Sequence, residues 1–146
     1  MATPIGKARE LLAQIETAAV AARITLPKTR YAQLGEPVVT CAALIVTLAR
    51  LDPAGPEYNV QSGCLTSQIG TFTLTIARDC AVTYDEEGID DPALVDEVSQ
   101  IMSDDGDFLW NFAAGLSLYL QKDWAMSWSL PGGLAISTLS LTAGVD

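Results

Sequence analysis

Residues 71–77 alternate large apolar side chains with threonine, and this pattern constrains the fold more than any other feature of the chain. The apolar set is Phe72, Leu74 and Ile76, and the threonine set is Thr71, Thr73 and Thr75. Successive side chains of a β-strand point to opposite faces of a sheet, so the segment is predicted to be a strand with one face toward the core. Its threonine face is suited to packing across a subunit boundary, with exposure to water as the alternative.

A second apolar segment, Val38–Leu48, is predicted to be the neighbouring strand. Both of its alternating faces are largely apolar, which is typical of a strand covered on both sides. A buried helix of the same length is the alternative, but Pro37 and Pro53 at the two ends favour a strand. We expect this strand to pair antiparallel with residues 71–77 across a long connection.

The C-terminal part is predicted to form two closing strands, residues 125–129 and 134–145, around a Pro-Gly-Gly turn. The apolar residues of the last strand change parity between Ile136 and Leu139. This change predicts either a bulge near Ser137–Thr138 or a strand that changes its burial partner along its length.

Apolar residues at three- and four-residue steps predict a helix over residues 3–24, with Thr3 as its N-cap and Pro4 in its first turn. Residues 26–36 are polar and are predicted to form an irregular loop. Two further helices follow an acidic turn, one beginning at Pro92 and a second one after a kink or break at Asp104–Asp107.

The predicted order is helix, strand, strand, helix, helix, strand, strand. Helices lying on one sheet give an α+β fold. We expect a single domain over residues 1–146, with an antiparallel sheet of about four strands flanked by an N-terminal helix and two central helices.

The chain of 146 residues contains no histidine and carries a formal net charge of −10. The lack of histidine excludes Ser-His-Asp triads, Cys-His dyads and most catalytic zinc sites. Residues 1–50 hold six basic and three acidic side chains, whereas residues 51–146 hold two basic and fifteen acidic ones. This separation predicts head-to-tail attraction between copies, with an ordinary solvated acidic face as the alternative.

Cysteine usage and hydropathy predict a protein without a membrane segment that stays where it is made. The cysteines at positions 41, 64 and 80 have no CxxC spacing and are expected to be reduced and buried. The longest uncharged apolar stretch, Val38–Ala49, is too short to span a bilayer, and the N-terminus does not resemble a signal peptide.

Carboxylates are the strongest candidates for chemistry, because a pair of acids on opposite sides of a cleft can hydrolyse a glycoside. The candidates for such a pair are Asp85, Glu86, Asp104 and Asp107. They lie in turns that lead into helices, where acidic side chains already cap the helix. The run Asp104–Asp107 lacks the alternating acidic positions of a calcium loop. The chain is therefore not expected to be an enzyme, and no cofactor or metal is predicted.

Aromatic and charged clusters predict contacts with other proteins instead. Exposed tryptophans are common interface anchors, and a basic-aromatic cluster can contact a phosphate or a neighbouring protein. The alternatives are burial of Trp110 under the closing strands and a solvated basic loop with Tyr31 packed beneath it. The candidate interface residues are Lys28, Arg30, Tyr31, Asp85, Glu86, Glu87, Trp110, Trp124 and Trp128.

Three sequence blocks in this order resemble small neck proteins of actinobacterial long-tailed phages. They are CAALIVTLARLDPAG at 41–55, FTLTIARDCAVTYD at 72–85 and LPGGL at 130–134, and together the resemblance covers most of residues 38–146. The order of elements is similar to that of tail terminator proteins, which have a sheet flanked by helices and assemble as a six-membered ring.

The resemblance implies a structural role in the virion. Such proteins cap the tail tube, bind the tube protein on one side and a head-completion or stopper protein on the other, and let DNA pass through the pore without specific binding. The expected protein is a homo-hexamer that assembles in the host cytoplasm and functions in the neck. A head–tail adaptor or stopper is the first alternative, and a monomeric acidic binding domain or enzyme is the second.

Overall fold

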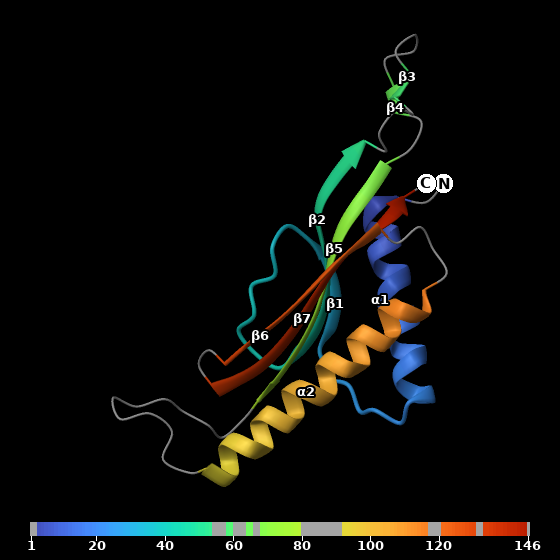
Figure 1. Ribbon diagram of the computed structural model, residues 1–146. Helices are drawn as coiled ribbons and strands as arrows, with labels where there is room; N and C mark the ends of the chain where they lie inside the picture. The colour runs from blue at the N-terminus through green and yellow to red at the C-terminus, as the bar shows by residue number, and fades with distance from the viewer. Residues whose placement is uncertain are drawn as a thin grey trace.

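A computed structural model describes residues 3–53, 58–59, 64–65, 68–79, 92–116, 121–130 and 133–145. Within them the elements follow the order α1 (Pro4–Ala21), β1 (Arg30–Leu34), β2 (Ala43–Pro53), β3 (Tyr58–Asn59), β4 (Cys64–Leu65), β5 (Gln68–Asp79), α2 (Pro92–Gly115), β6 (Gln121–Ser129) and β7 (Leu134–Val145). Five strands form one sheet in the order β1-β2-β5-β7-β6, and β3 pairs with β4 separately (Figure 1).

The fold is α+β, as predicted, but the sheet of the described residues is mixed and has five strands instead of about four antiparallel ones. β1 runs parallel to β2, and each of the other neighbouring pairs in the sheet is antiparallel. The predicted antiparallel pairing of the second apolar segment with residues 71–77 is confirmed by the β2–β5 register.

Both helices lie on one side of the sheet, α1 against β1 and β2, and α2 against β7 (Figure 1). Phe72, Leu74 and Ile76 are fully buried between these layers. They meet Leu11 of α1 and Leu109 of α2 in one continuous core. The alternation seen in the sequence therefore decides which face of β5 the helices cover.

The opposite face of the sheet is also largely buried. Thr73 and Thr75 are 9% and 1% exposed, and the neighbouring Ile45 and Thr47 of β2 are fully buried. Thr73 Oγ1 lies 3.4 Å from Ser140 Oγ across the strands. The prediction that the second strand is covered on both sides is confirmed. Both alternatives for the threonine face are wrong for Thr73 and Thr75, because the chain itself buries them.

The connection between β1 and β2 contributes to this cover. Parallel neighbours need a chain segment that returns from the end of one strand to the start of the next. Residues 35–42 make this return, and Val39 packs against Ala77, Leu134 and Ile136. β2 therefore begins at Ala43, later than the predicted start at residue 38.

The last strand changes its burial partner along its length, as one of the two interpretations predicted. Ile136 in its first half packs against Val39 on one face of the sheet, whereas Leu139 and Leu141 in its second half pack under the helices on the other face. The helix face of the first half holds the small Ala135, which packs against Val98 of α2. The pairing of β7 with β5 has no register shift. The alternative of a bulge near Ser137–Thr138 is wrong.

The first helix begins where it was predicted to begin. Thr3 is the N-cap, its Oγ1 accepts a hydrogen bond of 3.0 Å from the Gly6 N–H, and Pro4 occupies the first turn. The helix ends at Ala21, earlier than predicted. Arg23 adopts a left-handed φ of 59° and turns the chain away in a Schellman-type cap.

Two predictions about secondary structure are wrong. The segment 26–36 contains strand β1, which lies at the edge of the sheet and pairs with β2 alone among the described strands. Its polar composition is typical of an edge strand. The two central helices are one helix of 24 residues that runs through Asp104–Asp107. Asp105 is buried against Arg78 and Gly106 lies beneath Trp128, so the residues that resemble a helix stop are contacts with the sheet.

Candidate interaction surfaces at the two edges of the sheet

Trp128 of edge strand β6 lies across α2. Its Nε1 donates a hydrogen bond of 3.2 Å to the Met102 carbonyl, which also accepts a 3.0 Å bond from Ser137 Oγ. The indole fits here because Gly106 has no side chain, and a Cβ at that position would lie 2.8 Å from Trp128 Nε1. Trp128 remains 53% exposed, so the ring is held by the chain and still presents a large face to the outside.

Trp110 extends this aromatic surface along α2. It follows Gly106 by one helical turn and is 45% exposed, so it stands on the same side of the helix as the indole of Trp128. α2 has no basic residue and carries the acids Asp96, Glu97, Asp104, Asp105 and Asp107. We call the surface formed by Trp110, Trp128 and Asp107 beside β6 the acidic edge.

Asp105 differs from the other acids of α2 because it points into the protein. Its carboxylate lies 2.7 Å from Arg78 Nε of β5, and its side chain is 6% exposed. Burial raises the pKa of Asp105, and the hydrogen bond and positive charge of Arg78 counteract that rise in part. The pair fixes α2 on the sheet and leaves Asp104 and Asp107 exposed on the outer side of the helix.

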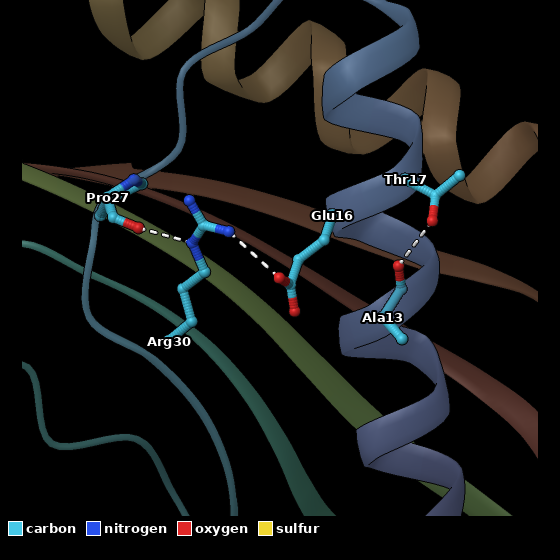
Figure 2. A network of polar contacts seen from close by, with 5 residues as sticks. All are labelled: Ala13, Glu16, Thr17, Pro27 and Arg30. Carbon is cyan, nitrogen blue, oxygen red and sulfur yellow. Dashed lines mark hydrogen bonds and ion pairs between the residues drawn. The ribbon is translucent and has the colours of Figure 1, made fainter.

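Arg30 organises the opposite edge of the sheet, where β1 meets α1. Its guanidinium lies 3.1 Å from Glu16 of α1, and its Nε donates a 2.8 Å hydrogen bond to the Pro27 carbonyl (Figure 2). Three other cations of the N-terminal region are exposed: Arg9, Arg23 and Lys28. None of them has an acidic partner within 4.0 Å among the described residues.

Exposed apolar side chains accompany these cations. Val20 at the end of α1 is 80% exposed, Leu34 of β1 is 67% exposed and Tyr31 is 36% exposed. Arg23 lies between α1 and β1 in a backbone conformation that glycine prefers. We call the surface formed by Val20, Arg23, Lys28, Arg30, Tyr31 and Leu34 the basic edge.

The candidate interface residues thus separate into two surfaces at opposite edges of one sheet. Lys28, Arg30 and Tyr31 lie at the basic edge, and Trp110 and Trp128 lie at the acidic edge. Trp124 belongs to β6, but its side chain lies outside the described residues, as do Asp85, Glu86 and Glu87.

Sequence reasoning missed Val20 and Leu34. Val20 directly follows Ala19, which belongs to the buried face of α1. A large apolar residue outside that face could have been predicted to be exposed. Leu34 gave no such signal, because its exposure follows from the position of β1 at the edge of the sheet.

No group of three potential metal ligands occurs in the part of the chain that the structure describes. Cys41 is a free, exposed thiol in the 35–42 connection, so the predicted burial is wrong for it. The side chains of Cys64 and Cys80 lie outside the described residues. Neither of the two described helices combines the length and apolar character needed to cross a membrane.

A scan against protein-family models and a search of curated proteins find no match for this chain. These comparisons therefore assign it to no family.

Proposed function

We propose that the chain is a ring-forming structural protein of a phage neck, and that it acts there as the tail terminator. In this role a ring of identical copies, a hexamer by the resemblance described above, caps the tail tube. One side of the ring binds the tube protein, and the other receives the head-completion or stopper protein. DNA passes through the pore, and the protein functions in the assembled virion.

One observation carries this proposal: the two edges of a single sheet bear opposite charge, and each also exposes large apolar side chains. A ring needs heterologous contacts, in which one patch of each copy meets a different patch of the next. The acidic edge and the basic edge are such a pair. The acidic excess of the chain also suits a pore for DNA, because like charges do not adhere.

The ring is tested by measuring mass in solution with light scattering and by imaging the protein in negative stain. A closed ring with a central pore is the expected result. A compact monomer at all concentrations would overturn the proposal and favour a monomeric acidic domain.

The terminator role is tested separately by incubating the protein with purified, headless tail tubes. The expected result is one ring at one end of each tube. If rings form but do not bind tube ends, the terminator role is wrong and the ring belongs to a head–tail adaptor or stopper.

A further inference from the structure

We propose that the ring is closed by sheet continuation, with the outer edge of β6 in one copy hydrogen-bonded to the outer edge of β1 in the next. The acidic edge then packs against the neighbour's basic edge. This inference specifies the contact on which the proposed ring depends, and the occupant of each edge is a second copy of this chain.

Strand order and direction allow this continuation. β1 and β6 are the outermost strands of the five, so among the described residues each pairs with one strand only. The chain of parallel and antiparallel pairings makes β6 run opposite to β1. Rotation about an axis along the strands preserves strand directions, so β6 and the next copy's β1 meet as an antiparallel pair, which forms a regular hydrogen-bond ladder.

The side chains of Leu34 and Trp128 lie on the same face of the sheet. Leu34 is in register with Leu48, and Trp128 is in register with Ser137, whose hydroxyl bonds to α2. Leu48 packs in the core under the helices. Leu34 and Trp128 therefore both project to the helix side. The pairings align Trp128 through Ser137, Ile76 and Leu44 with Arg30, so joining the two strands without a shift brings Trp128 beside Arg30 of the next copy.

The helix layer continues in the same way. α1 lies over β1 and β2 at one end of the sheet, and α2 lies over β7 beside β6 at the other. Sheet continuation places α2 of one copy beside α1 of the next. Asp107 then faces the side of the neighbour that holds Arg23 and Lys28. Charge complementarity of this kind fixes the direction of assembly and excludes pairing of like edges.

The experiment compares single substitutions of three exposed apolar residues by glutamate. Val20→Glu and Leu34→Glu each remove an apolar contact and place an acid against the acidic edge. Val38→Glu is the matched control, because Val38 is 72% exposed but lies in the connection between β1 and β2. All three side chains are exposed in the single chain, so the substitutions are expected to change the thermal stability of the dissociated protein little.

Dilution series followed by light scattering give the association constant. We expect V20E and L34E to weaken association about tenfold or more, and V38E to leave it unchanged. Equal association of L34E and wild type, or an equal loss in V38E, would overturn the sheet-continuation contact. Rings that persist in V20E and L34E would leave the proposed function standing and refute only this interface, whereas a monomeric wild type would refute both.

A mixing experiment tests the heterologous character of the contact. L34E retains an intact acidic edge, so it should add to one end of a growing wild-type arc and prevent closure. We expect substoichiometric L34E to lower the yield of closed rings, and V38E not to lower it. An unchanged ring yield with L34E would refute head-to-tail joining through β1.

Discussion

Substitution of Gly106 by alanine tests whether the position of the Trp128 indole depends on the absence of a side chain at Gly106 of α2. The added Cβ would lie 2.8 Å from Trp128 Nε1, 3.2 Å from its Cζ2 and 3.3 Å from Met126 Cε. Contacts at these distances require the indole to move away from the helix. Movement of the ring breaks the bond between Nε1 and the Met102 carbonyl.

The expected change in the free energy of unfolding combines opposing contributions. Replacing glycine inside a helix stabilises it by about 1 kcal/mol. Loss of the Trp128 hydrogen bond costs about 1 kcal/mol. Overpacking against the indole and Met126 costs about 1–3 kcal/mol. We therefore expect Gly106→Ala to destabilise the protein by about 1–3 kcal/mol, the reverse of what helix propensity alone predicts.

Urea unfolding followed by circular dichroism at constant protein concentration measures this change. Gly115→Ala is the matched control on the same helix, because a Cβ at Gly115 meets no atom of the described residues within 4 Å, and this substitution is expected to be neutral or stabilising. In a Trp128→Ala background, Gly106→Ala should become stabilising. A Gly106→Ala protein as stable as the wild type would refute the packing argument.

Three further substitutions test local contacts. Thr3→Ala removes the oxygen that accepts from the Gly6 N–H and should lower the free energy of unfolding in urea by about 1 kcal/mol. Thr17→Ala is the control and should change this free energy little, because the Thr17 hydroxyl bonds to Ala13 of its own helix. Equal effects of the two substitutions would refute the role of Thr3 as the N-cap. Arg23→Gly should raise the free energy of unfolding by about 1 kcal/mol, because glycine adopts the left-handed φ without strain. Arg23→Ala keeps the strain and serves as the control. Equal stability of the two variants would contradict this prediction. Asp105 has a raised pKa in the folded state, so its favourable contribution is present below the ordinary value of 3.8 and is lost as pH rises through the raised pKa. Asp105→Asn should therefore gain stability relative to the wild type as pH rises above that value, and a difference independent of pH would refute this.

Local signals in the sequence determined the elements with strong periodicity. The alternation at residues 71–77 predicted strand β5 and its core face, and Thr3 with Pro4 predicted the start of α1. These predictions were correct because backbone geometry alone relates side-chain spacing to the face that is buried. The parity change in the last strand was equally informative, and it showed correctly that Ile136 and Leu139 have different burial partners.

Contacts between distant residues determined what the sequence left open or indicated wrongly. β1 is a strand because β2 offers it a parallel edge, not because its own residues alternate. α2 continues through Asp104–Asp107 because Asp105 finds Arg78, which lies 27 positions earlier, and because Gly106 admits Trp128.

The two candidate surfaces show the same division. Composition alone separated a basic N-terminal part from an acidic remainder, since charge can be counted along the chain. Only the tertiary structure placed these charges at opposite edges of one sheet, beside Val20 and Leu34 on one side and Trp110 and Trp128 on the other. The order of strands in a sheet is set by pairing between segments that are far apart in the chain. Such pairing produces no periodic pattern in the sequence of either strand, so the sequence does not predict it.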